Sequence, residues 1–234
     1  MIPGAGGTES LPILAVVGGT GALGGGLARR WAARGYPVII GSRAAGKARL
    51  QADQINADDP ASPVRGMDNR AAAGAADIVV VTVPYANHRP ILAAIRAAAA
   101  GKLVVDATVP LVPPKVASAQ LPPPGSAAQA AQEILGAEVR VVSAFHNVAA
   151  HKLRPGAEID CDVLVCGEHA ADREAVIALV AAAGLRGIHA GPLANSAAAE
   201  ALTSVLIGIN RRYKVDGAGI RITGLEPDPP AGDG

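Results

Sequence analysis

The segment of this chain best suited to chemistry is a glycine cluster near the N-terminus. Gly19, Gly21 and Gly24 fit the pattern G-x-G-x-x-G, and the positions between them are filled by Thr20, Ala22 and Leu23. An apolar run precedes the cluster and a helix-favouring run follows it. In that setting Gly19 permits a tight turn, Gly21 lets a diphosphate approach the main chain, and Gly24 lets the helix pack closely on the strand. The pattern predicts a dinucleotide site, the alternative being a turn that is merely flexible.

The end of the second apolar run indicates which dinucleotide would bind. Enzymes that prefer NAD carry an acidic residue there, which binds the ribose hydroxyls. This chain instead has Ser42 and Arg43, with Lys47 one helical turn later. A hydroxyl, a guanidinium and an ammonium group suit a 2′-phosphate. We therefore expect NADP(H) to bind better than NAD(H), unless the two cations serve only as solvated surface residues.

Residues that could surround a second reactant follow three later apolar runs. These segments read TVPYANH, DATVP and SAFHNVAAHKL. If the runs are parallel strands, their carboxyl ends meet at one edge of the sheet, where such folds bind ligands. Val83 and Pro84 would then line a nicotinamide pocket, and Ser143, His146 and Val148 would face it from the other side.

Two other kinds of chemistry fit these residues poorly. His146 and His151 are five residues apart without a nearby carboxylate or thiolate, which matches no common zinc pattern, so no metal is expected. Ser143, His146 and Asp106 could be assembled into a hydrolase triad, but the chain lacks a G-x-S-x-G segment. A buried His146 without catalytic duty is the plain alternative.

The elements that must position these residues follow from Val- and Ile-rich runs that alternate with Ala-rich ones. Apolar runs without period-two alternation indicate strands buried on both faces, as in parallel sheets. We predict strands at residues 12–17, 37–41, 78–83, 102–106, 139–145 and 162–166, and helices at residues 22–34, 44–56, 87–100, 126–136, 171–183 and 195–211. The predicted fold class is α/β, a doubly wound parallel sheet of the Rossmann type with a second, smaller C-terminal domain.

The domain organisation follows from the same pattern. The dinucleotide-binding domain is expected over residues 12–145, and the smaller domain, which would close the second reactant's site, over residues 146–225. Residues 1–11 and 226–234 are rich in Gly, Pro and acidic residues, so we expect flexible tails there. Six prolines between positions 109 and 125 exclude a regular helix or central strand from that segment.

The composition excludes several classes of partner. The 234 residues are 50% hydrophobic, 2% aromatic and carry a net charge of +1, so neither a basic surface nor stacking platforms for nucleic acid are expected. The sequence shows neither a leader-like segment nor an apolar run of bilayer length, so we expect a cytoplasmic protein without a membrane partner. Cys161 and Cys166 are five apart in an expected strand, which points them to opposite faces and argues against a disulfide between them.

Several segments resemble one enzyme family. GGTGALG, IIGSR with the following Lys47, TVPY, VVSAFH, DVLVCG, GPLANS and EALTSVLIGINRRYK occur in the order and spacing of the NADP-dependent deazaflavin oxidoreductases. The resemblance covers about residues 12–225. It implies a homodimeric enzyme that transfers hydride reversibly between NADP(H) and the deazaflavin coenzyme F420, with the two cofactor rings stacked and carrying the chemistry.

The resemblance also implies roles for individual residues, carried over by matching position. NADP would be held by Thr20, Ser42, Arg43 and Lys47, with Val83 and Pro84 beside its nicotinamide. His146, Val148 and Thr203 would surround the deazaflavin, and His146, as the catalytic residue, would supply a hydrogen bond near a ring carbonyl or nitrogen.

This chain departs from the archaeal members at two places. They carry Thr-Ile-Pro after the histidine, where Asn147, Val148 and Ala149 stand here, and Arg and Ser on the last helix, where this chain has Ala197 and Ala201. The basic group formed by Arg211, Arg212 and Lys214 is either a solvated helix end or a substitute contact for the deazaflavin tail. Two alternative functions stay open, an NADPH-dependent reductase of a flavin or a small imine or ketone, and a non-catalytic NADP-sensing module.

Overall fold

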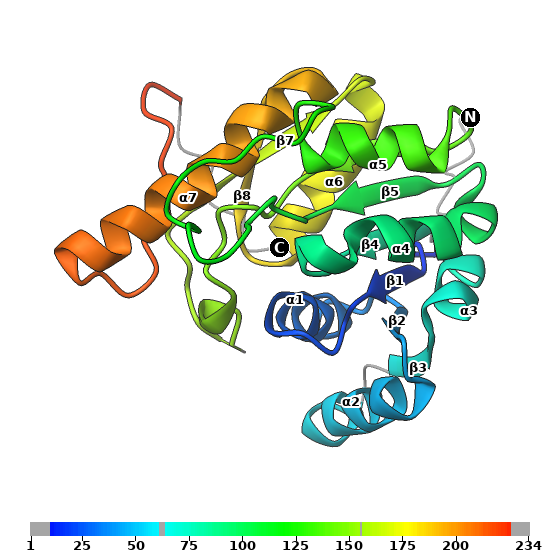
Figure 1. Ribbon diagram of the computed structural model, residues 1–234. Coiled ribbons are helices and arrows are strands. Elements are labelled where there is room, and N and C mark those ends of the chain that lie inside the picture. The colour runs from blue at the N-terminus through cyan, green and yellow to red at the C-terminus, as the bar shows by residue number, and fades with distance from the viewer. Residues whose placement is uncertain (1–9, 61–63, 155, 226–234) are drawn as a thin grey trace, which may run out of the picture.

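A computed structural model describes residues 10–60, 64–154 and 156–225, which form one central sheet with helices on both faces (Figure 1). Its eight strands lie in the order β3-β2-β1-β4-β5-β6-β7-β8. The strands are β1 (Leu14–Val17), β2 (Val38–Ser42), β3 (Val64–Asp68), β4 (Ile78–Val81), β5 (Leu103–Asp106), β6 (Arg140–Ser143), β7 (Asp162–Gly167) and β8 (Arg186–His189). Strands β1 to β6 run parallel, β7 is antiparallel to β6, and β8 is parallel to β7. The order of the first six strands is that of a doubly wound dinucleotide-binding sheet, and the predicted fold class is confirmed.

The helices follow the strands in alternation. They are α1 (Ala22–Ala32), α2 (Ala45–Asp58), α3 (Asn69–Gly74), α4 (Tyr85–Ile95), α5 (Ala127–Leu135), α6 (Ala170–Ala182) and α7 (Ser196–Tyr213), with short 3₁₀ turns η1 (Arg96–Ala99), η2 (Ala150–Lys152) and η3 (Leu193–Asn195). Because successive strand residues point to opposite faces, Leu14 and Val16 pack with α1, α2 and α6, whereas Ala15 and Val17 pack with α3, α4 and α5. Side chains of the buried strands and of the helices thus form two hydrophobic cores, one on each face of the sheet.

The predicted elements are confirmed to within a few residues at their ends, but two strands, one α-helix and two short 3₁₀ turns were not predicted. Strand β3 reads VRGMD and only Val64 in it is buried, because β3 is an edge strand that needs no apolar run. Gly66 allows helix α2 to lie against it, since a Cβ there would meet the Ala48 main chain. Helix α3 directly follows β3, and its six residues are too few to give a helical pattern. Strand β8, which reads RGIH at the other edge, is also too polar to give a clear signal.

The residues beyond position 145 extend the same sheet rather than starting a new one. Trp31 on α1 joins the two parts, because its Nε1 donates a hydrogen bond to the Leu179 carbonyl at 2.8 Å. The Trp31 ring also meets Phe145 edge to face, with 5.9 Å between ring centroids. The division into domains at residues 145 and 146 stays a prediction.

The chain after α7 folds back along β7. Asp162, at the start of β7, is fully buried and accepts hydrogen bonds from Arg186, Arg221 and the Ile222 amide at 2.6–2.9 Å. Those contacts lower the pKa of Asp162 to about 2, although burial acts in the opposite direction. We call residues 216–222 the C-terminal segment, and Asp162 anchors it to the sheet.

Other sequence expectations concern the ends and the surface. Residues 1–9 and 226–234, which were expected to be flexible, lie outside the described residues, while Ser10 and Leu11 are exposed and in neither helix nor strand. The segment from 107 to 126 contains no helix or strand, as its prolines predict. Cys161 and Cys166 are buried and free. Within the described ranges, no helix combines the length and apolar character required to cross a membrane.

Candidate functional site

The glycine turn connects β1 to α1 at the carboxyl edge of the sheet. Gly18, one residue before the predicted pattern, has a φ of +82°, a conformation that favours glycine. The Gly19 amide donates to the Val16 carbonyl at 3.0 Å, and a Cβ on Gly19 would lie 2.8 Å from that same oxygen. The tight turn expected of Gly19 therefore depends on Gly18 and Gly19 together.

The other two glycines of the pattern have different surroundings. A Cβ on Gly24 would meet the Thr82 hydroxyl and lie 2.9 Å from the Gly19 Cα, so helix and strand pack as closely as predicted. A Cβ on Gly21 would meet only the Gly18 carbonyl oxygen, at 3.3 Å.

The start of α1 is therefore open on the side of Gly21. Thr20, Gly21 and Ala22 are exposed and Leu23 is half-buried. The helix has no side-chain cap, so its first amides are available to an anion. This edge suits a diphosphate.

Strand β2 ends beside the glycine turn. The Gly41 carbonyl oxygen accepts hydrogen bonds from two amides of the turn, at 3.0 and 3.1 Å. Ser42 is buried, while Arg43 and Lys47 are exposed. Neither cation forms an ion pair with any residue that the structure describes. Both are available to a phosphate on the adenosine ribose.

The end of β4 lies on the opposite flank of the glycine turn from Ser42. A Cβ on Gly18 would lie 2.7 Å from Val83 Cγ1, so the turn and Val83 are in close contact. Val83 is buried, and Pro84 is exposed as the residue that precedes α4. A dinucleotide whose diphosphate lies at the turn could reach Ser42 with one end and Val83 with the other.

His146 follows β6 at the same edge and is 5% exposed. Burial lowers the pKa of His146 to about 4, although the negative charge of Asp106 and the acceptance of a hydrogen bond from the ring by the Asp106 main chain act in the opposite direction. The ring is therefore neutral at pH 7. Its Nε2 atom is buried and has no hydrogen-bond partner among the described residues. A buried nitrogen without a hydrogen-bond partner is uncommon in proteins, and it fits a ring nitrogen that binds a ligand.

A cavity of about 200 Å³ brings together the three residues expected around the deazaflavin, His146, Val148 and Thr203. The Thr203 hydroxyl donates to the His146 carbonyl at 2.8 Å, which ties α7 to the segment after β6. The rest of the lining comes from neighbouring residues, α7 and the C-terminal segment: Asn147, Ala149, His151, Leu206, Ile207, Asn210, Gly217 and Ala218.

A second unpartnered polar atom lies at the adenosine end of the site. Asn69 begins α3, is 9% exposed, and its Oδ1 has no hydrogen-bond partner in the described part of the chain. A Cβ on Gly41 would lie 3.0 Å from this oxygen, so the Asn69 amide faces the end of β2. A bound dinucleotide and a second ring would fit this site. They would meet the open start of α1, the two exposed cations and the unpartnered atoms of Asn69 and His146.

Comparison with known proteins identifies the family. A profile described as "NADP oxidoreductase coenzyme F420-dependent" matches residues 13–110. An F420-dependent NADP reductase of Methanocaldococcus jannaschii is 39% identical over 228 residues, which cover 91% of this chain and 99% of that protein. This chain belongs to the F420-dependent NADP oxidoreductase family. A second member, from Methanothermobacter thermautotrophicus, is 41% identical over 222 residues, with 91% of this chain and 95% of that protein covered.

Solved structures agree with membership of the F420-dependent NADP oxidoreductase family. A crystal structure of an Arthrobacter sp. FB24 protein, provisionally described as an F420-dependent NADP reductase, superposes with a TM-score of 0.76. It is 27% identical in sequence, and the match covers 91% of this chain and 99% of that one. The resemblance inferred from the sequence segments is confirmed.

Sequence reasoning missed part of the site of this F420-dependent NADP oxidoreductase family member. Asn69 was overlooked because β3 and α3 were not predicted. Leu206 and Asn210 follow Thr203 at helical spacings of three and seven, a signal that could have placed them on the same face of α7. The basic group of Arg211, Arg212 and Lys214 is exposed beyond this stretch and does not line the cavity.

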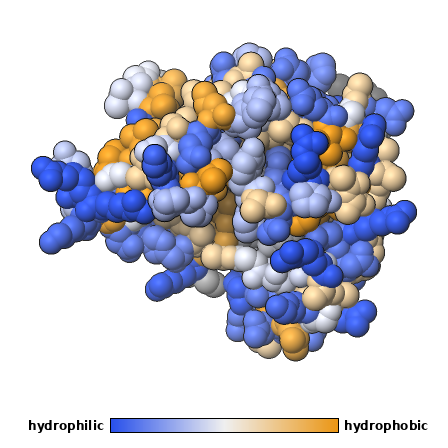
Figure 2. Space-filling model, in the orientation of Figure 1, coloured by the Kyte–Doolittle hydropathy of each residue, from blue (hydrophilic) through white to orange (hydrophobic). Residues whose placement is uncertain are grey.

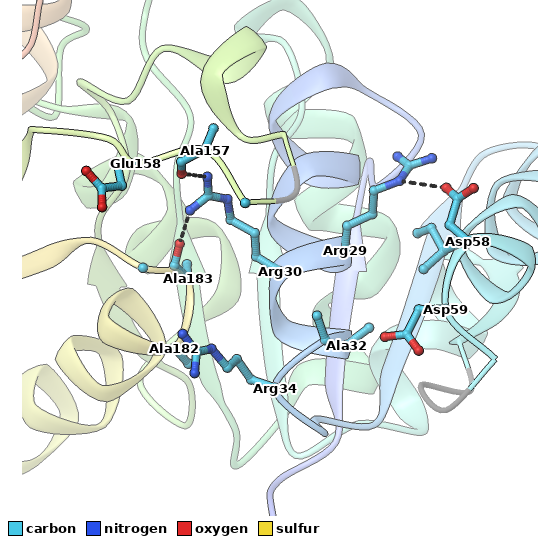
Figure 3. Close-up of a pocket in the computed structure, with 14 residues that line it drawn as sticks. Arg29, Arg30, Ala32, Arg34, Asp58, Asp59, Ala157, Glu158, Ala182 and Ala183 are labelled. Carbon is cyan, nitrogen blue, oxygen red and sulfur yellow. Dashed lines mark hydrogen bonds and ion pairs between the residues drawn. The ribbon is translucent and has the colours of Figure 1, made fainter. Parts of the chain in front are cut away.

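A larger cavity, of about 420 Å³, lies between the C-terminal ends of α1, α2 and α6 (Figure 3). Arg30 crosses it and donates to the carbonyls of Ala183 and Ala157 at 2.7 and 2.6 Å, and Arg29 pairs with Asp58 at 3.7 Å. None of the predicted site residues lines it. Since α1 has eleven residues, about 16 Å separate this cavity from the glycine turn.

Proposed function

We propose that this chain catalyses reversible hydride transfer between NADP(H) and coenzyme F420. One observation carries the proposal. Apart from Thr203 on α7, the residues expected for both cofactors follow strands β1, β2, β4 and β6, which are parallel and so end at one edge of the sheet. The relatives of this chain are F420-dependent NADP reductases. When bound, the two cofactors supply the hydride chemistry between their rings, and the protein supplies orientation.

The glycine turn and the end of β2 are proposed to bind NADP(H). Gly19, Thr20, Gly21, Ala22, Leu23 and Gly24 would surround the diphosphate. Ser42, Arg43 and Lys47 would hold the 2′-phosphate, and Arg43 carries most of the preference over NAD(H) because its guanidinium forms charge-assisted hydrogen bonds. Val83 and Pro84 would give the nicotinamide an apolar surface.

The cavity beneath α7 is proposed to take the deazaflavin ring. Val148 and the aliphatic part of α7 would exclude water from its face. His146 would bind a ring carbonyl or nitrogen through the unpartnered Nε2, as a neutral donor or acceptor, since the pKa of His146 is about 4. His146 thereby orients the ring against the nicotinamide.

A homodimer that uses α7 belongs to the same proposal. Helix α7 projects from the rest of the molecule in Figure 1, and hydrophobic residues appear among hydrophilic ones on this side in Figure 2. Val205, Ile209 and Tyr213, spaced four residues apart on α7, are 52%, 36% and 72% exposed. Such a stripe on one helix face suits a contact with a second copy of the chain. The two free, buried cysteines fit a cytoplasmic location.

The test is a spectroscopic assay with both cofactors. Oxidised F420 and NADPH are mixed with the protein, and the deazaflavin absorbance is expected to fall, then recover when excess NADP is added to the reduced product. NADH should support this reaction much less well. Turnover of FMN or a cyclic imine without turnover of F420 would instead identify an NADPH-dependent reductase of another class, and NADPH binding without turnover of any acceptor would indicate an NADP-sensing module.

A further inference from the structure

Two ionisable side chains are buried beside the candidate site without a role in the proposed binding. Asp106, the last residue of β5, is fully buried, and His88, in the first turns of α4, is 2% exposed. His88 Nε2 lies 2.6 Å from Asp106 Oδ2. Burial alone would raise the pKa of Asp106, but the charge and hydrogen bond of His88, with hydrogen bonds from Thr108, hold this pKa below its ordinary value. Asp106 is therefore a buried carboxylate, which a fold tolerates only when it is paired.

Asp106 is connected to the Val83–Pro84 turn by two routes. The first runs through His88, because α4 begins directly after Pro84. The second runs through Thr108, whose amide donates to Asp106 Oδ1 at 3.0 Å and whose hydroxyl donates to the Val83 carbonyl at 3.4 Å. The Asp106 carboxylate thus holds the turn proposed to face the nicotinamide from two sides.

Asp106 is also connected to His146 on its other side. Asp106 pairs with Ser143 in the sheet register, and its carbonyl accepts a hydrogen bond from the Ala144 amide at 3.2 Å. The negative charge and the main chain of Asp106 both act to raise the pKa of His146, against the larger effect of burial. Asp106 therefore stands between the residues proposed to contact the two cofactors.

We propose that Asp106 and His88 form a positioning pair, which sets the placement of the Val83–Pro84 turn relative to the His146 ring. This inference rests on the proposed function, because those two features are the surfaces assigned to the two cofactor rings. Hydride transfer needs the reacting atoms about 3–3.5 Å apart, and a displacement of about 1 Å can cost about 100-fold in rate. The pair does not contact the adenosine end, so it affects the rate of transfer more than the affinity for NADPH.

The kinetic test compares two substitutions at one position. Asp106→Ala removes both routes and is expected to lower kcat about 10- to 100-fold, while the Kd of NADPH changes less than about threefold. Asp106→Asn keeps an oxygen for the Thr108 amide and an amide group for His88, so kcat is expected to return to within about fivefold of the wild-type value. A merely structural role would lower Tm without this separation between kcat and Kd.

Asp172 provides the matched control. It is a buried aspartate on α6 that pairs with Arg140 at 2.5 Å, and it lines neither the site nor the cavity. Asp172→Ala is expected to lower Tm and leave kcat per folded molecule unchanged. Equal kcat losses in Asp106→Ala and Asp172→Ala, or no kcat loss in Asp106→Ala, would overturn the positioning role.

A second readout does not depend on the reaction. The imidazole NMR signals of His146, assigned by their loss in His146→Asn, are expected to shift in Asp106→Asn and to stay in place in Asp172→Asn. Unchanged His146 signals in Asp106→Asn would refute the inference. This readout decides the question even if Asp106→Ala does not fold. Shifted signals in a protein that does not turn over F420 would leave the positioning pair standing and remove only the proposed function.

Discussion

The buried His146 ring predicts a specific dependence of stability on pH. In the unfolded chain this histidine takes up a proton as the pH falls below 6.5, whereas in the folded protein its pKa is lowered to about 4. Between these values the unfolded state binds the extra proton, so the free energy of unfolding decreases as the pH falls. The difference between the two pKa values corresponds to about 3 kcal/mol, and the loss ends below about pH 4, where both states are protonated.

Urea unfolding between pH 7.5 and 4, followed by circular dichroism, measures this contribution. Other groups titrate over the same interval, so the quantity to compare is the difference between wild type and His146→Asn. That difference is expected to change by about 3 kcal/mol across the interval. If wild type and His146→Asn lose stability in parallel, the folded protein protonates His146 as easily as the unfolded chain does, and the argument from its burial is wrong.

Three further predictions concern other parts of the molecule. Arg43→Ala should weaken NADPH binding about 10- to 100-fold in a fluorescence titration and NADH binding far less. Arg49→Ala, which removes an exposed cation from α2, should change neither affinity, and equal weakening for both cofactors in Arg43→Ala would contradict the phosphate contact. Gly24→Ala should lower the free energy of unfolding by about 1–3 kcal/mol, because the added Cβ has no space. Gly46→Ala, in an open helix position, should raise the free energy of unfolding by up to about 1 kcal/mol. An unchanged free energy of unfolding in Gly24→Ala would argue against the close packing. Asp162→Asn should lower Tm at pH 7. The difference in Tm between wild type and this variant should shrink as the pH falls from 3.8 toward 2, because wild type loses the same charge there. A Tm difference that stays constant over this range would rule out an ionised Asp162 as the anchor.

The sequence predicted the central sheet well because its strands are buried on both faces. Runs such as Leu14–Val17 and Ile78–Val81 contain only apolar residues, and the turn after the first of them contains the glycine pattern. Strand β3 escaped because an edge strand pairs on one side only, so Arg65 and Asp68 are tolerated in it. The local pattern of apolar residues indicates which strands are buried, and the strands at the edges of a sheet are the least buried.

Individual side chains show the same limit at the site. Gly21 and Arg43 could be assigned because a short motif fixes their place beside a strand end. Asn69 and the contact of His88 with Asp106 depend on which strands become neighbours, which no short segment encodes. The lowered pKa of His146 likewise arises from burial by residues far along the chain, so the histidine could be identified while its protonation could not.

The continuous sheet has a consequence for how the cofactors enter. Strands β6 and β7 pair at Val142 with Gly167 and at Ser143 with Cys166, and the Ser143 hydroxyl is hydrogen-bonded to Ser196 at 2.7 Å. A rigid-body hinge between the two parts of the chain would have to break these bonds on every catalytic cycle. Both coenzymes should therefore dock onto a preassembled platform, with association rates that rise linearly with concentration rather than reaching the plateau of a slow opening step.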